Sequence, residues 1–417
     1  MLSKTRISDP ELYGLVCEEL DRQEHNIEMI ASESTAAVEL MELSGCVFTS
    51  KTTEGYPGAR FQAGSQVADK MEQLGNARAR ALYGAEHANL QPYSGSTANY
   101  GVYAAVLEPG DRVLGMRLDH GGHLTHGGSA NFMSKFYDFI PYGLNRETEL
   151  IDYEELERLA HERRPKLIVA GGSAYPRLID YGRIAGIARS AGALLMVDMA
   201  HIAGLVAAKV IPSPVPHADF VTSSTTKTLC GPRGGMILCR AEHAKALDRG
   251  VFPGSLSSIH LNIMAAKVWM FQYAASDAFR ATMEQVVRNS RALVGELTRH
   301  GFRVIGGGSD NHIVLVDLRS KKITGKLFQD ALEYVGITVN KNMIPFDAEK
   351  PSVTSGVRIG TTAVSQRGLK EPEIVRIAEL MARVADAPED RAVLDACRAD
   401  ARVLIADFPL YPAECAP

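Results

Sequence analysis

The sequence lacks the features that mark a protein stabilised by disulfides, a protein with a structural metal site, or a membrane-embedded protein. Its six cysteines include no Cys-x-x-Cys pair, so neither a disulfide framework nor a zinc site is expected. No apolar run reaches the roughly 18 residues that a membrane-spanning helix needs. The net charge is -4, and this small acidic excess gives no reason to expect nucleic acid or an anionic membrane surface as a partner.

The first ten residues carry charges and no apolar centre, so we expect no secretory signal. Together with the unpaired cysteines, this favours a cytoplasmic protein with reduced thiols. What the chain does have is length and an ordinary composition, with 417 residues of which 46% are hydrophobic and 23% are charged. Such a chain is long enough for two domains and a large core.

Helical and strand patterns alternate through the first two thirds of the chain. Helices are expected at 67–83, 97–107, 153–163 and 181–191. Strands are expected at 88–91, 112–116, 167–170, 220–222 and 236–239, and in the apolar run that ends at Asp198. This alternation predicts an α/β fold with a mostly parallel sheet covered by helices on both faces.

The pattern changes after residue 275. A long helix is expected at 277–300, followed by a strand at 312–318 and a helix at 326–335. We therefore expect a smaller C-terminal α/β domain over residues 276–417 and a large domain over 46–275. Residues 1–45 are expected to form an N-terminal arm.

Asp198 and Lys227 together point to a cofactor. Asp198 ends an apolar run, and Lys227 lies further along among small hydroxyl residues and before the glycine-rich stretch 231–235. Pyridoxal phosphate needs an amine that bonds to its aldehyde and a carboxylate that keeps its ring nitrogen protonated. Either residue alone is more often a surface charge or a turn former. The two in this order and context favour a site for pyridoxal phosphate.

Several longer stretches resemble the serine hydroxymethyltransferase family, and the resemblance covers nearly the whole chain. The most specific stretches are Asp119–Gly127 and Val197–Leu205, and shorter ones are Ile30–Glu33, Glu54–Gly58 and Gly356–Thr361. Members of this family are pyridoxal-phosphate enzymes of one-carbon and amino-acid metabolism. The resemblance implies the aspartate-aminotransferase fold (fold type I) and a homodimer, or a dimer of dimers, with shared active sites.

The resemblance also implies roles for individual residues. Lys227 would bind the cofactor covalently, and Glu54 would reach the neighbouring subunit's site as an acid–base group. The other cofactor contacts implied are Ser94, Gly95 and Ser96 at the phosphate, His123 and Ala200 on the two ring faces, Ser173 and His201 near the ring hydroxyl, Asp198 at the ring nitrogen, and Ser257 and Ser258 in a loop that normally touches the neighbour's phosphate. The substrate carboxylate would bind Arg358 and Ser32, and folate would bind Phe61, Leu118, Leu124 and Asn342.

Two of these features also have an ordinary structural explanation without any functional role. The serine–glycine turn at 94–96 also suits an ordinary helix cap, and an isolated arginine such as Arg358 usually forms a surface ion pair. The family match on both sides of Arg358 weakens the second interpretation.

The chain departs from the family pattern around this site. Thr226 and Thr52 stand where the family has a histidine and a tyrosine. The other departures are Phe61 and Gln62 for two tyrosines, Tyr93 for a histidine, Ser257 and Ser258 for two glycines, and Ser352 for a phenylalanine. Thr226 is counted with the catalytic residues, and Thr52 and Gln62 with the substrate-binding ones.

Three interpretations of the departures remain open. They are drift in a serine–glycine enzyme; a changed acceptor, with the lost rings making room for a methyl group on Cα; or a folate-independent aldolase or transaldolase for larger β-hydroxy amino acids. A non-enzymatic role is disfavoured because Lys227, Asp198, Arg358 and Glu54 are retained. We expect a hydroxymethyltransferase that moves a one-carbon unit between tetrahydrofolate and the Cα of a small amino acid, either glycine/serine or alanine/α-methylserine.

Overall fold

The computed structural model describes residues 3–411, which divide into two compact units. One unit is Glu39–Glu284, and the other joins the described residues up to Val38 with those from Gln285 onward. The division falls inside helix α11 (Asp277–Arg299). The domain boundaries expected at residues 45 and 275 stay predictions. Within the described residues, no helix is both long and apolar enough to cross a membrane.

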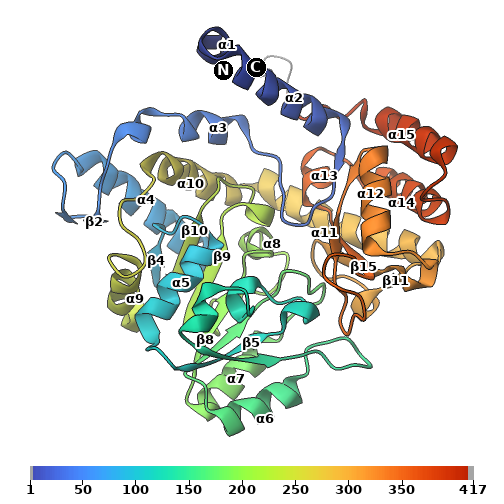
Figure 1. Cartoon of the computed structure of the whole chain (residues 1–417). Helices are drawn as coiled ribbons and strands as arrows, with labels where there is room; N and C mark the ends of the chain where they lie inside the picture. The colour runs from blue at the N-terminus through green and yellow to red at the C-terminus, as the bar shows by residue number, and fades with distance from the viewer. Residues whose placement is uncertain (1–2, 412–417) are drawn as a thin grey trace. The chain divides into compact units, whose positions relative to one another are not determined.

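The unit Glu39–Glu284 is built on a seven-stranded sheet with the order β4-β10-β9-β8-β7-β5-β6 (Figure 1). Only β10 runs antiparallel to its neighbours. The strands are β4 (His87–Asn89), β5 (Arg112–Met116), β6 (Asp138–Tyr142), β7 (Leu167–Ala170), β8 (Leu194–Asp198), β9 (Phe220–Ser224) and β10 (Gly235–Cys239). The mostly parallel sheet expected from the sequence is confirmed.

Both faces of this sheet are buried. Val113, Val169, Met196 and Phe220 point to one face and pack with α5 (Gly95–Val106) and α9 (Ala244–Val251). Their neighbours along each strand point to the other face because side chains alternate, and these are also buried. Helix α7 (Tyr181–Ala191) contacts β7 and β8, and α6 (Tyr153–Arg163) packs beside α7. The near-continuous apolar strands therefore follow from burial on two sides.

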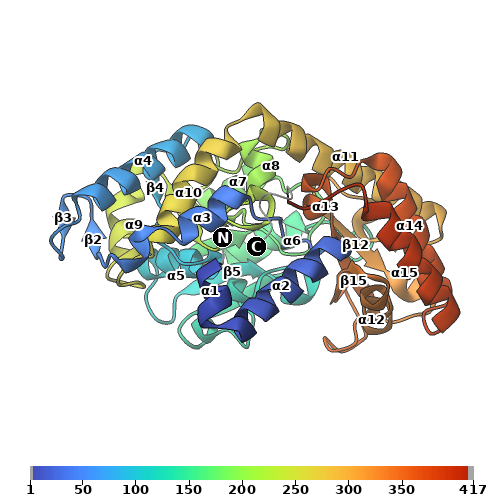
Figure 2. The ribbon, with the colours of Figure 1, turned by 90° about the horizontal axis from the view of Figure 1, so that it is seen from above.

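Further helices and a hairpin complete this unit. Helices α4 (Gln66–Tyr83) and α10 (Leu261–Ala274) lie side by side (Figure 2). The remaining elements are α3 (Val38–Ser44), which begins at the unit boundary, the hairpin β2 (Gly55–Tyr56) and β3 (Ala59–Arg60), and α8 (Ala203–Ala207). The 3-10 turns are η1 (Val47–Ser50), η2 (Leu118–His120), η3 (Leu124–His126), η4 (Phe132–Lys135), η5 (Lys227–Leu229) and η6 (Ala241–His243).

The other unit carries a four-stranded antiparallel sheet with the order β11-β12-β15-β14. Its strands are β11 (Arg303–Val304), β12 (Ile313–Asp317), β14 (Asn340–Asn342) and β15 (Gly356–Gly360). Its other elements are α12 (Gly325–Val335), α13 (Thr362–Gln366), α14 (Glu371–Asp386), α15 (Arg391–Ile405), η7 (Ile305–Gly307), η8 (Leu318–Lys321) and most of α11.

The N-terminal residues belong to this second unit. They form α1 (Ser3–Ser8), α2 (Pro10–His25) and β1 (Ile27–Glu28), which pairs in parallel with β13 (Ile337–Thr338). Ile27 and Met29 are fully buried in the core of this unit. The guanidinium of Arg367 donates to the backbone carbonyls of Glu24 and Asn26 at the end of α2. The arm is therefore attached by a strand pair, by core packing and by an arginine.

Candidate active site

The predicted cofactor residues of the larger unit, apart from Ser257 and Ser258, gather at one edge of its sheet. Asp198 is the last residue of β8, and Lys227 follows β9. Ser173 and His123 follow β7 and β5, which are the next strands in the sheet. The carboxyl ends of parallel strands meet at one edge, and ligands of open α/β sheets bind there. The strand order therefore brings residues far apart in the sequence to one place.

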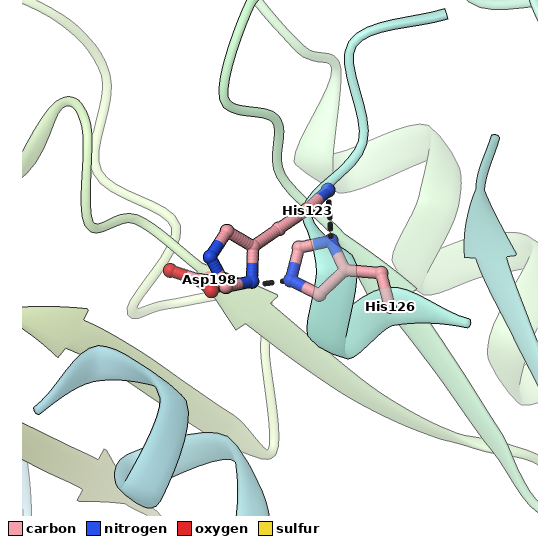
Figure 3. Close-up of side chains that lie close together, drawn as sticks. All are labelled: His123, His126 and Asp198. Atoms are coloured by element: carbon pink, nitrogen blue, oxygen red, sulfur yellow. Dashed lines mark hydrogen bonds and ion pairs between the residues drawn. The ribbon is translucent and has the colours of Figure 1, made fainter. Parts of the chain in front are cut away.

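Asp198 is held by three donors, two of which the sequence analysis missed. Nδ2 of Asn99 and Nε2 of His126 donate to its Oδ2 at 2.9 and 3.1 Å, and the backbone N–H of Ala200 donates to its Oδ1 at 3.0 Å. Figure 3 shows His126 and His123 beside the Asp198 carboxylate. The side chain of Asp198 is only 8% exposed. Such a carboxylate is fixed in orientation and leaves water little access.

The electrostatics keep this carboxylate ionised. Burial raises the pKa of Asp198, but the hydrogen bond from His126 and the electrostatic interactions with His126, His123 and Lys227 outweigh burial and hold the pKa well below its usual range. A permanently ionised acid is what a protonated ring nitrogen requires as its partner.

A hydrogen-bonded chain continues from Asp198 to His123. Asn99 Nδ2 also donates to the Thr125 hydroxyl at 2.7 Å, and the hydroxyl oxygen of Thr125 lies 2.7 Å from Nδ1 of His123. The Thr125 N–H donates to the same His123 nitrogen at 3.2 Å. These bonds fix the imidazole of His123 at the position where the family resemblance puts a ring over the cofactor.

His123, His126 and Asp198 also have the composition of a metal site, with ligand atoms within 4.8 Å of one another. Both nitrogens of His126 are already engaged, since Nε2 donates to Asp198 and Nδ1 accepts the N–H of His123. A metal ion would have to replace the bond between His126 and Asp198. The hydrogen bonds account for the cluster, and the expectation of no metal stays a prediction.

Lys227 has an unusual backbone. Its φ is +42°, which is rare for a residue with a side chain and costs on the order of 1–3 kcal/mol. The segment around it is held by hydroxyl groups: Thr226 bonds to Ser224 at 2.8 Å, and Thr228 donates to the carbonyl of His201 at 2.8 Å. Local strain that the surroundings enforce is typical of functional residues. The strain thus supports the proposed role of Lys227.

The turn at 94–96 lies close to the same edge of the sheet. Ser94 caps α5 by accepting the N–H of Thr97, so the helix begins at Gly95, two residues earlier than expected. A side chain at Gly95 would meet the backbone nitrogen of Ser224 at 3.3 Å. A glycine therefore allows close packing of this helix N-terminus against the end of β9, and its backbone N–H groups suit a phosphate.

These residues fit pyridoxal phosphate. The donor set supplies an amine (Lys227), an ionised buried carboxylate (Asp198) and a helix N-terminus (Gly95) around one edge of the sheet. The fold and this donor set define a pyridoxal-phosphate enzyme of fold type I.

The comparison with protein families identifies the family. The model of serine hydroxymethyltransferase matches residues 5–381 of the 417, so the chain belongs to the serine hydroxymethyltransferase family. Enzymes of this family are pyridoxal-phosphate-dependent hydroxymethyltransferases with tetrahydrofolate as co-substrate. The family, the fold class, the class of enzyme and the cofactor expected from the sequence are confirmed.

A second group of predicted residues surrounds Glu54 within the same unit. The side chains of Gln62 and Ser257 both donate to the Glu54 carboxylate. Ser258 donates to the carbonyl of Thr53 at 3.3 Å, and its own carbonyl accepts the hydroxyl of Tyr93. Three departures from the family pattern, Gln62, Ser257 and Ser258, therefore bond directly to Thr53 or Glu54, and a fourth, Tyr93, bonds to Ser258.

The predicted carboxylate-binding residues lie in the smaller unit. Arg358 lies on β15, where its Nε donates to Asn340 of β14 at 3.2 Å, and burial lowers the pKa of Arg358 to about 10. The segment that carries Ser32 runs along the end of this strand, because Gly360 donates to the carbonyl of Met29 at 2.8 Å. A bound carboxylate would offset the cost of the buried guanidinium.

The predicted folate residues are partly exposed. Phe61, Leu118 and Leu124 are 75%, 50% and 49% exposed, and Thr52 is also exposed. The amide of Asn342, in the smaller unit, donates to the carbonyl of Met343 at 2.6 Å. The roles assigned to individual site residues stay predictions.

Proposed function

We propose that this enzyme transfers a hydroxymethyl group between tetrahydrofolate and the Cα of a small amino acid, and that it accepts a substrate with a methyl group on Cα. The pair is alanine and α-methylserine. The observation that carries this proposal is Thr226: it directly precedes Lys227, and its hydroxyl is turned toward Ser224 at 2.8 Å. The family resemblance puts an imidazole at this position.

Each predicted site residue has its own role in the proposed reaction. Lys227 supplies the amine that holds the cofactor, and Asp198 keeps the ring nitrogen protonated. Pyridoxal phosphate, when bound, supplies the electron sink for the pair released at Cα. Arg358 and Ser32 orient the substrate through its carboxylate, and Glu54 moves the proton of the substrate hydroxyl.

A methyl group on Cα needs space of its own. Protein interiors are close-packed, and inserting a methyl group into a filled site costs about 1–3 kcal/mol. Thr226 and Thr52 are smaller than the rings that the family has at these positions, and the Thr226 side chain bonds to Ser224. Both features favour a site with room beside Cα.

Folate binding has support from exposed apolar side chains. Phe61 presents an aromatic face that is 75% exposed, and its ring centroid lies 5.7 Å from that of Phe252. Titration calorimetry with tetrahydrofolate in the presence of amino acid tests the proposal. Phe61 lacks the hydroxyl of a tyrosine, so binding is expected to be weaker by about tenfold at most. A calorimetric trace without binding heat would favour the folate-independent aldolase.

The proposed assembly is a homodimer, or a dimer of dimers, in which Glu54 serves the neighbouring subunit's site. Its support is the family resemblance of the stretch that begins at Glu54. The proposed location is the cytoplasm, and none of the five described cysteines forms a disulfide, which suits that location.

A further inference from the structure

Glu54 makes an unusually complete set of contacts for a partly exposed carboxylate. Its Oε2 accepts Nε2 of Gln62 at 2.9 Å, and its Oε1 accepts the Ser257 hydroxyl at 2.5 Å. The Glu54 N–H donates to Oε1 of Gln62 at 2.8 Å. Gln62 therefore contacts both the backbone and the side chain of Glu54, and each carboxylate oxygen has one donor.

The two donors are themselves anchored to Thr53, the residue beside Glu54. Thr53 is fully buried, and its hydroxyl bonds to Ser65 at 2.8 Å, while Ser65 donates to the backbone carbonyl of Gln62 at 2.9 Å. The carbonyl of Thr53 accepts the N–H of Ile259 at 3.2 Å, which fixes the loop that carries Ser257. The donors thus have little freedom to move away from the carboxylate.

Neither donor belongs to the family pattern. The resemblance puts a tyrosine at Gln62 and a glycine at Ser257. Glycine has no side chain, and a phenol offers a single oxygen, whereas the planar amide of Gln62 accepts the Glu54 N–H with one atom and donates to the carboxylate with another. The contacts are therefore a property of this chain.

We propose that Gln62 and Ser257 are positioning residues that hold the Glu54 carboxylate in one orientation for proton transfer with the substrate hydroxyl. This inference rests on the acid–base role proposed for Glu54 and adds the groups that control it. Catalysis by a proton-transfer group depends on its orientation, and small displacements cost large factors in rate.

The same contacts set the protonation of Glu54. The hydrogen bond from Ser257, followed by that from Gln62, lowers the pKa of Glu54 below its usual value. Removing either donor therefore raises this pKa, and the carboxylate takes up its proton at a higher pH. If the ionised form accepts the hydroxyl proton, the acid limb of the kcat profile for substrate cleavage moves to higher pH.

Two substitutions and their matched controls test the inference in the holoenzyme. Ser257→Ala and Gln62→Met remove one donor each, and Ser257→Thr keeps the hydroxyl. Ser255→Ala removes a hydroxyl of the same loop that donates to the carbonyl of Val251 instead, and Gln66→Met changes an exposed glutamine at the start of α4. The measurements are pH profiles of kcat and KM, and the hydrogen-exchange rate of the Glu54 amide.

We expect kcat to fall about tenfold or more in Ser257→Ala and Gln62→Met, with KM little changed and the acid limb at higher pH. The Glu54 amide, which bonds to Gln62, exchanges faster in Gln62→Met. Both controls, Ser255→Ala and Gln66→Met, keep the wild-type values, and Ser257→Thr, which retains a hydroxyl, loses less kcat than Ser257→Ala and shifts the acid limb less.

Glu54→Gln separates the two claims. If this variant keeps the wild-type kcat, the acid–base role of Glu54 is wrong, and so is the positioning role of Gln62 and Ser257. If Glu54→Gln loses activity while Ser257→Ala and Gln62→Met keep the wild-type pH profile and exchange rate, the acid–base role stands and the positioning role is overturned.

Discussion

At the scale of single residues, the site combines a fixed charge with a strained amine. Asp198 is ionised because its three donors and its electrostatic interactions with neighbouring residues outweigh its burial. Lys227 adopts a left-handed backbone conformation that hydroxyl groups on both sides maintain. The backbone conformation of Lys227 costs folding free energy, whereas the donors of Asp198 offset the cost of burying its charge. We interpret them as the structural requirements of pyridoxal phosphate.

The assignment of Lys227 is tested by covalent labelling. Lys227→Ala is expected to lose the visible absorbance of the bound cofactor and at least a hundredfold of turnover, because no other group supplies the amine in this geometry. Borohydride reduction of the wild-type holoenzyme followed by peptide mapping should label Lys227. Lys245→Ala, a change at an exposed lysine of α9, is the control. A label on a different lysine would contradict the assignment.

Thr52 and Thr226 are tested by restoring the family residues. Thr52→Tyr with Thr226→His returns two rings to the site, and we expect kcat/KM for α-methylserine cleavage to fall roughly 5- to 150-fold more than that for serine. The reason is that the rings fill the space that the Cα-methyl group requires. Steady-state kinetics on both substrates provides the measurement. Equal losses on the two substrates would show that the threonines do not set specificity.

At the scale of elements, the phosphate turn depends on Lys267 of α10. Its buried ammonium donates to the carbonyls of Leu90, Pro92 and Gly235 at 2.7, 2.9 and 2.8 Å. These carbonyls belong to the segment that leads into Ser94 and to the first residue of β10. One side chain thereby joins three elements at the base of the turn. The position of Gly95 thus depends on a residue more than one hundred and fifty positions away in the sequence.

Lys267→Met is expected to lower the free energy of unfolding by about 2–4 kcal/mol at pH 9, because the buried carbonyls that accept from the Lys267 side chain lose their donor. Burial lowers the pKa of Lys267 to about 7, whereas an unfolded lysine titrates near ~10.4. Between these pH values the unfolded chain binds more protons, so the wild type gains about 1.4 kcal/mol per pH unit relative to the variant.

Urea unfolding at pH 7 and pH 9 measures this difference, with Lys245→Met as the control on an exposed helix position. The gap between wild type and Lys267→Met should widen at the higher pH. A gap that stays constant would show that Lys267 keeps an ordinary pKa.

The helices and strands of the structure show how much of the fold could be predicted from the sequence. The helices 153–163 and 181–191 and the strands 112–116 and 167–170 match the structure residue for residue. The helices show a clear helical period, and the strands are short apolar runs between turn signals. The sequence did not predict helix α10. Nine of its fourteen residues are buried, Lys267 among them, so the helix lacks the polar and apolar faces that make an amphipathic helix recognisable.

The residues of the candidate site could likewise be predicted only in part. Lys227 and Asp198 could be recognised from their local sequence, but the contacts of Asn99 and His126 with Asp198 arise only when α5 and the 3-10 turn η3 pack at the edge of the sheet. One local signal existed, since Asn99 lies four positions after Gly95 on the same helix face.

At the scale of the whole molecule, the proposed dimer predicts complementation between two inactive variants. Lys227→Ala and Glu54→Gln each damage every site of their own homodimer. In a mixed dimer with shared sites, one of the two sites carries neither lesion and the other carries both. Mixing the variants under conditions of subunit exchange should therefore recover up to half of the wild-type activity per mixed dimer. Confirmed exchange without recovered activity would contradict shared sites.

The activity proposed for this enzyme is hydroxymethyl transfer to a Cα that carries a methyl group. The most direct measurement is kcat/KM of the wild-type holoenzyme for α-methylserine and for serine, each with and without tetrahydrofolate. We predict that α-methylserine is cleaved at least as efficiently as serine, and that the rate rises with tetrahydrofolate. Rapid serine cleavage with no α-methylserine cleavage would contradict this prediction and leave an ordinary serine–glycine enzyme.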